Sequence, residues 1–240
     1  MLIGILETGR PPEEFEGAYP DYPTAFRQLL CADAPAWRFR SFAVLDNELP
    51  EGVNTCDAWL VTGSRFGAYE QIGWITRLEQ FLRDAYAAAV PIAGICFGHQ
   101  LLAQALGGRV LKSDKGWGVG VHAYQLDEMP AWADETPDEF VIQAFHQDQV
   151  VELPSDARVL GGSEFCPNGL LVYGDKALSF QGHPEFAADY ASALLESRRG
   201  TLLPTQVADA ALAGVESPLD QGLSARWIVA FIEHAVRVNT

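Results

Sequence analysis

The stretch Gly94-Ile95-Cys96-Phe97-Gly98-His99-Gln100 decides the fold that we predict for this chain. It follows an apolar run over residues 87–95, which predicts a buried strand, and it precedes residues 101–106, which predict a helix. A strand, a Gly-x-Cys-x-Gly turn and a helix are the layout of a nucleophile elbow, and the helix N-terminus beside the sulfur favours the thiolate. A cysteine at a strand end is otherwise usually a small buried hydrophobic residue. The flanking glycines lead us to predict that Cys96 is a nucleophile that attacks a carbonyl carbon.

A histidine that could activate this cysteine lies about ninety residues later. Residues 178–182 predict a short strand that ends in the turn His183-Pro184-Glu185. The proline favours an extended backbone at His183, and in extended backbone the side chains of residues i and i+2 lie on the same face. Glu185 can then orient one imidazole nitrogen while the other nitrogen faces the thiol. Alone, this turn would indicate a solvated histidine, but with the elbow it predicts a catalytic triad of Cys96, His183 and Glu185.

These two motifs together resemble the class I (triad-type) glutamine amidotransferase family. Residues 57–64 are similar to the family's oxyanion strand, because they predict a strand that ends in a glycine turn. Residues 145–150, Phe-His-Gln-Asp-Gln-Val, are similar to its His-x-Asp-x-Val segment. The resemblance covers about residues 1–190. The chain looks most like stand-alone members labelled "GMP synthase-like", a neighbourhood that includes the plant γ-glutamyl peptidases.

The resemblance implies a fold and an activity. The implied fold is a flavodoxin-like three-layer α/β sandwich, with a mainly parallel central sheet, the nucleophile elbow and a small antiparallel sheet. The implied reaction is hydrolysis of glutamine or a γ-glutamyl amide through a γ-glutamyl thioester on Cys96. The backbone N–H groups of Gly63 and Phe97 would form the oxyanion hole, and the substrate would contact Gly63, Gln100 and His146.

Three of the neighbouring polar residues have a second interpretation. Gln100 could instead be a surface-facing residue of the helix. His146 and Asp148 could belong to a plain loop. We expect His99 to be exposed in the first turn of the helix and not to be catalytic, because His183 is the better candidate.

Strands that alternate with helices before residue 108 predict an α/β domain with a largely parallel sheet. We expect strands at 2–6, 37–44, 58–62 and 92–95, and helices at 23–30, 74–88 and 101–106. Later strand-like runs at 110–111, 118–126, 140–145, 158–161, 169–173 and 177–180 predict antiparallel hairpins and a small added sheet. Helices should follow at 187–198, 205–213 and 223–238. We treat 1–240 as a single domain, with a core over about 1–190 and a helical C-terminal extension over about 187–240.

Composition limits the possible partners. The net charge of −16 argues against nucleic acid and anionic membrane surfaces. No apolar run approaches the roughly 20 residues that span a bilayer, and residues 1–7 read as a strand without a signal peptide. The four cysteines lack Cys-x-x-Cys spacing, and the glycine-rich residues 116–120 lack the spacing of a nucleotide site. We expect a cytoplasmic enzyme without a metal or other cofactor that acts on a small γ-glutamyl substrate.

The acceptor of the ammonia is open, because the ATP pyrophosphatase loop Ser-Gly-Gly-x-Asp is absent from the sequence. One interpretation is the glutaminase subunit of a two-chain amidotransferase with an unidentified synthase partner. A second is a free-standing γ-glutamyl peptidase with water as acceptor, which the tail of about fifty residues after Glu185 mildly favours. A third, of a different class, is a non-catalytic binding or regulatory module with a vestigial triad. The intact triad positions argue against the third.

Overall fold

The structure is a computed structural model that describes residues 1–239. Its strands are β1 (Leu2–Leu6), β2 (Arg38–Phe42), β3 (Ala58–Val61), β4 (Ile92–Ile95), β5 (Arg109–Lys112), β6 (Gly118–Leu126), β7 (Glu139–His146), β8 (Asp148–Glu152), β9 (Ala157–Gly162), β10 (Leu170–Tyr173) and β11 (Ala177–Phe180). Its α-helices are α1 (Tyr22–Cys31), α2 (Gly73–Ala87), α3 (Phe97–Ala105), α4 (Ala188–Arg198), α5 (Thr205–Ala213) and α6 (Gln221–Asn239). Short 3-10 helices lie at Glu13–Phe15, Val44–Asp46 and Val53–Thr55.

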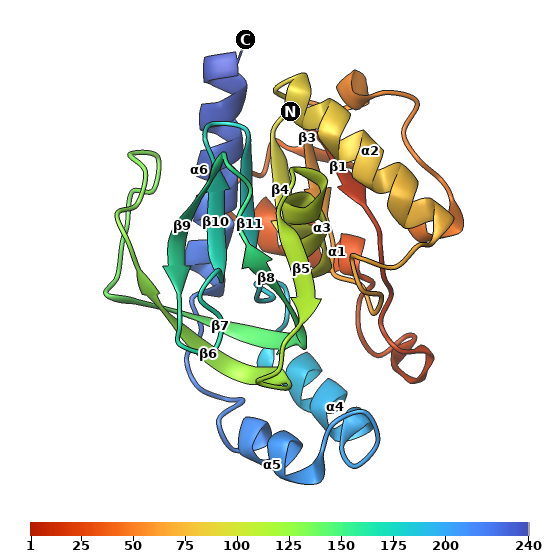
Figure 1. Cartoon of the computed structure of the whole chain (residues 1–240), viewed down its shortest axis with the longest axis vertical. Coiled ribbons are helices and arrows are strands. Elements are labelled where there is room, and N and C mark those ends of the chain that lie inside the picture. Colours follow the sequence, from red (N-terminus) through yellow and green to blue (C-terminus); the bar gives the residue numbers. More distant parts are fainter. Residues whose placement is uncertain (240) are drawn as a thin grey trace.

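The strands form one large sheet and one small sheet (Figure 1). The large sheet has nine strands in the order β2-β1-β3-β4-β11-β10-β9-β6-β7. The strands from β2 to β11 in this order pair in parallel, and those from β11 to β7 pair antiparallel. The small sheet is the antiparallel pair of β5 and β8. The expected α/β fold class, with a mostly parallel central part and a small antiparallel sheet, is therefore confirmed.

The predicted elements are present, with two differences that concern the site. Helix α3 begins at Phe97, directly after Cys96, whereas the sequence pattern placed its start at residue 101. Strand β8 was not predicted as a strand. Its residues pair with β5 from Lys112↔Asp148 to Arg109↔Glu152, with an irregular register at one end.

Two hydrophobic clusters cover the two faces of the parallel strands. Helices α1 and α6 pack on the face that carries Ile5 and Leu60. Helices α2 and α3 pack on the opposite face, which carries Trp59 and Val61, because neighbouring strand residues point to opposite sides. The result is three layers, with helices on both sides of the sheet. Within residues 1–239, no helix has the length and apolar character required to cross a membrane.

The C-terminal helix α6 contributes to this core. Phe231 is fully buried in the same cluster as the β1 and β3 side chains. We expect Phe231→Ala to lower the free energy of unfolding by about 3–5 kcal/mol, because it removes a buried aromatic ring and leaves a cavity. Urea denaturation should show this loss, whereas Val238→Ala, at a half-exposed position of the same helix, should change it by less than about 0.5 kcal/mol. Equal stability of the two variants would contradict a core role for α6.

The carboxyl ends of the parallel strands meet at one edge of the sheet. The segments that follow β3, β4 and β11 there contain Gly63, Cys96 and His183, respectively. Strand β7 reaches the same edge, since Gln143 forms a backbone bridge with His183. Helices α4 and α5 lie beyond β6 and β7 at this end of the molecule (Figure 1). In open α/β sheets, this edge is where ligands bind.

Candidate active site

Cys96 occupies a strained turn between β4 and α3. Its backbone has φ 52° and ψ −100°, which non-glycine residues rarely adopt. A Cβ atom at Gly94 would lie 2.8 Å from the carbonyl oxygen of Gly98, and one at Gly98 would lie 2.5 Å from that of Val61. Only glycine fits at both positions. The predicted elbow geometry is therefore present, with the sulfur at the N-terminus of α3.

His183 and Glu185 form a buried pair beside this turn. The imidazole Nδ1 lies 2.8 Å from Glu185 Oε1, and the side chains are 6% and 0% exposed. The backbone N–H of His183 donates to the carbonyl oxygen of Gln143 at 2.7 Å. The ring of Phe186 stacks on the imidazole, with the centroids 4.0 Å apart and the planes at 9°. The imidazole is thus fixed from its backbone, from its edge and from one face.

The pKa of His183 is lowered by burial and raised by neighbouring charges and hydrogen bonds. Burial by itself lowers the pKa of the imidazole. The negative charges of Cys96 and Glu185, and their hydrogen bonds to the ring, act in the opposite direction and raise the pKa to about 10. The imidazolium form is therefore favoured at neutral pH, which suits an ion pair with a thiolate.

We expect Glu185→Gln to move the alkaline limb of kcat/KM to lower pH. The carboxylate is one of the charges that raise the pKa of His183, so its removal lets that pKa fall, and the protonated donor is lost at a lower pH. A pH profile from about 6 to 10.5 checks this shift. Glu79→Gln, at a partly buried position of α2 where the carboxylate pairs with Arg83, should leave the limb unchanged. An unchanged limb in Glu185→Gln would show that Glu185 does not set the protonation of His183.

Gly63 lies against both Cys96 and His183. A Cβ atom placed on it would be 2.8 Å from His183 Cε1 and 3.8 Å from Cys96 Cβ. The hydroxyl of Thr8 lies 3.0 Å from the carbonyl oxygen of Gly63 and holds this backbone in place. Phe97 is the first residue of α3, where backbone N–H groups have no partner within the helix. The structure thus brings Gly63 and Phe97 next to the sulfur, and their role in an oxyanion hole stays a prediction.

Two glutamines connect the site to β8. Gln100 is buried, and its Nε2 donates to the carbonyl oxygen of Asp148 at 2.9 Å and to Gln181 Oε1 at 3.2 Å. Gln181 Nε2 in turn lies 3.8 Å from Cys96 Sγ. Gln100 therefore does not face solvent, and it reaches the sulfur through Gln181. Contact of Gln100 with substrate stays a prediction.

Sequence reasoning missed Gln181 and Phe186 as parts of the site. They flank the Gly-His-Pro-Glu turn on either side, so their position next to the motif was the available signal. Gln181 contacts the sulfur, and Phe186 contacts the imidazole. Neither contact follows from residue type alone.

The expectation that His99 is exposed is wrong. Its side chain is fully buried, and its Nδ1 lies 2.8 Å from Ser179 Oγ. The reason is that α3 is covered on both sides, by the parallel sheet and by β5 and β8. Burial lowers the pKa of His99 to about 3, so the ring is neutral.

His146 is also buried and neutral. Burial lowers its pKa to about 3, and its Nδ1 lies 3.2 Å from the carbonyl oxygen of Asp148. Its ring lies against those of His122 and Phe165. The preceding residue, Phe145, is closer to the chemistry, because its carbonyl oxygen lies 3.9 Å from Cys96 Sγ. Contact of His146 with substrate stays a prediction. Across residues 1–239, no cluster of three or more His, Cys, Asp or Glu side chains is placed to hold a metal ion.

Comparisons with known proteins bear on the family and the fold. Residues 44–197 match the family model described as glutamine amidotransferase class-I. The chain is 31% identical to a glutamine amidotransferase-like protein of Schizosaccharomyces pombe, over 96% of this chain and 98% of that protein. It is 32% identical to gamma-glutamyl peptidase 4 of Arabidopsis thaliana, over 77% and 76% of the two chains. The crystal structure of a glutamine amidotransferase from Thermotoga maritima superposes with a TM-score of 0.72, at 22% identity, over 96% of this chain and 98% of that one.

Proposed function

The chain belongs to the class I glutamine amidotransferase family, and from this premise we propose that it hydrolyses a γ-glutamyl amide bond through a thioester on Cys96. Family membership and the γ-glutamyl peptidase relative support hydrolysis of a glutamine-type amide. The observation that carries the finer proposal is the strained Cys96 beside the buried His183–Glu185 pair. A nucleophile, a base and an orienting carboxylate are the three parts of a triad that catalyses acyl transfer.

The first half-reaction forms the thioester. The thiolate of Cys96 attacks the γ-carbonyl carbon, and the electron pair of the C=O double bond moves onto oxygen. The N–H groups of Gly63 and Phe97 hold this oxyanion. The imidazolium of His183 then gives its proton to the amide nitrogen, the C–N bond breaks, and ammonia or an amine leaves.

The second half-reaction releases glutamate. Neutral His183 takes a proton from water, and the resulting hydroxide attacks the thioester carbon. The C–S bond breaks, the thiolate returns, and His183 is again protonated. Glu185 holds the imidazole in one orientation through both steps. The net change is amide plus water to carboxylic acid plus amine, and it needs no cofactor.

Water is the acceptor in this proposal, so the chain acts as a free-standing γ-glutamyl hydrolase. Gamma-glutamyl peptidase 4 of Arabidopsis thaliana supports this choice, because it is 32% identical to this chain over 77% of its length. A glutaminase that transfers ammonia to an unidentified synthase partner is the alternative. The two differ in what the isolated chain does: the hydrolase turns over alone, and the partner-dependent glutaminase has little activity alone.

The deciding experiment is an assay of the purified chain against glutamine, glutathione and other γ-glutamyl amides, with Cys96→Ala as control. Turnover of γ-glutamyl peptides by the wild type alone is the expected result. Turnover of glutamine only after addition of a partner would favour the amidotransferase subunit. If no compound is turned over and a glutamine-analogue electrophile does not alkylate Cys96, the enzyme proposal is wrong.

A further inference from the structure

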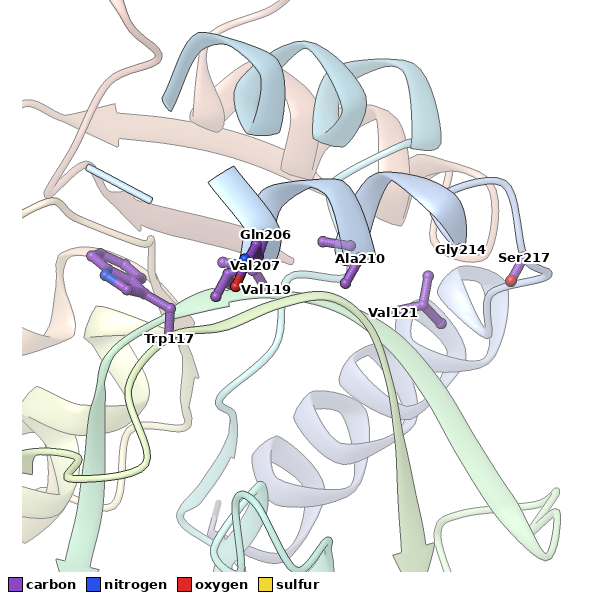
Figure 2. Close-up of a pocket in the computed structure, with 9 residues that line it drawn as sticks. Trp117, Val119, Val121, Gln206, Val207, Ala210, Gly214 and Ser217 are labelled. Carbon is purple, nitrogen blue, oxygen red and sulfur yellow. The ribbon is translucent and has the colours of Figure 1, made fainter. Parts of the chain in front are cut away.

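A groove runs between β6 and α5, and its lining contains none of the candidate-site residues (Figure 2). Its volume is about 570 Å³, which lies within the usual range for a small-molecule pocket. Trp117, Val119 and Val121 line the side of the strand, and Val207, Ala210 and Gly214 line the side of the helix. We call it the β6–α5 groove. Gln206 and Ser217 are the polar lining residues, and no lining residue carries a charge, so the groove suits an uncharged, mainly apolar group.

The glycine-rich residues 116–120 explain the shape of the groove. Trp117, Val119 and Val121 line the groove and are separated along the chain by the glycines at 118 and 120. Gly120 has φ 83°, and a Cβ atom on it would lie 2.9 Å from Ala211 Cβ. Because no side chain intervenes there, α5 approaches β6 closely, and Val119 and Val121 stand on either side of the contact.

One end of the groove is connected to Cys96 through Phe145. This residue lies directly opposite Val119 in the pairing of β6 with β7, so the two side chains share a face. Its ring contacts that of Trp117, with the centroids 5.8 Å apart. Its carbonyl oxygen lies 3.9 Å from Cys96 Sγ. Phe145 therefore lies between the Trp117 end of the groove and the sulfur of Cys96.

We propose that the β6–α5 groove binds an apolar group on the amine side of a γ-glutamyl substrate, beyond the scissile amide bond. This inference rests on the proposed function and adds the class of substrate. Glutamine has only ammonia on that side and leaves the groove empty. A γ-glutamyl amide whose amine carries an aliphatic or aromatic group fills it. The groove would therefore make the chain select such amides over glutamine and over γ-glutamylglycine.

The test compares γ-glutamylphenylalanine with γ-glutamylglycine, which differ only in the apolar side chain. We expect kcat/KM of the wild type to be about 10- to 100-fold higher for the phenylalanine compound, as burial of a small apolar group allows. Ala210→Phe fills the groove from an exposed position of α5, and it should abolish this preference while leaving glutamine hydrolysis unchanged. Ala213→Phe, exposed on the same helix and outside the groove lining, should keep the preference.

Calorimetry separates failure of the groove from failure of the enzyme proposal. γ-Glutamylphenylalanine is titrated into Cys96→Ala, with and without Ala210→Phe. Tighter binding of this compound than of γ-glutamylglycine, lost with Ala210→Phe, supports the groove even if no chain turns over any substrate. Glutamine hydrolysis without any preference, or a preference that survives Ala210→Phe, overturns the groove and leaves the proposed function standing. No binding and no turnover overturns both.

Discussion

Replacing Cys96 with alanine is expected to lower kcat/KM for γ-glutamyl hydrolysis by at least about 10⁴-fold. The proposed reaction passes through a bond to this sulfur, and loss of the nucleophile in a well-studied serine protease costs about 10⁶-fold in kcat. The remaining groups can only bind substrate and polarise its carbonyl. Initial rates with γ-glutamyl peptides measure the loss, and circular dichroism checks that the variant is folded.

The other free cysteines supply matched controls for this prediction. Cys31 is exposed, and Cys166 is buried, where desolvation raises the pKa of the thiol to about 12. Cys31→Ala and Cys166→Ala should retain activity, and mass spectrometry should find a glutamine-analogue electrophile on Cys96 alone. Activity of Cys96→Ala above about one hundredth of the wild type would show that the sulfur does not form the intermediate.

Gly63→Ala is expected to lower kcat by about 10²- to 10³-fold, the range found when one oxyanion donor is removed from a protease. The added methyl group would lie 2.8 Å from His183 Cε1, closer than real Cβ contacts allow. Neither partner can yield easily, because His183 is held by Glu185 and Phe186 and because Thr8 holds the backbone of residue 63. The N–H of residue 63 should therefore move away from the position that the oxyanion occupies.

Kinetics and structure together test this second prediction. The fall should be mainly in kcat, because the oxyanion exists only after attack on the carbonyl carbon. Gly73→Ala is the matched control, since a Cβ atom there meets nothing within 4 Å. A Gly63→Ala chain with wild-type kcat would exclude this backbone from the oxyanion hole. A loss seen only in thermal stability would assign Gly63 a packing role.

The features that could be predicted from the sequence are those that short-range geometry dictates. The spacing of Gly94, Cys96 and Gly98 predicts the elbow, because only glycine fits where these backbone segments meet. The spacing of His183 and Glu185 predicts their contact, because an extended turn directs both side chains to one side. The alternation of strands and helices predicts the mostly parallel sheet, because a helix that connects two strands usually leaves them parallel.

The features that could not be predicted depend on residues far apart in the chain. His99 lies one position from Gly98, yet its ring is buried and contacts Ser179 of β11, which is 80 positions away. The contact of Gln181 with Gln100 joins residues 81 positions apart. Strand β8 was not predicted, because it begins at Asp148, within the segment that resembles the family's His-x-Asp-x-Val motif. Such contacts depend on how the layers pack, and local sequence patterns do not reveal that packing.

The positive φ of Cys96 has a consequence for how this chain can evolve. A non-glycine residue in that conformation costs roughly 1–3 kcal/mol, a considerable fraction of the 5–15 kcal/mol that typically stabilises a folded domain. Selection for robustness alone would relax the turn, whereas selection for turnover would keep it. The hydrophobic clusters on both faces of the sheet stabilise the folded chain. This stability lets evolution keep Cys96 in an energetically unfavourable conformation.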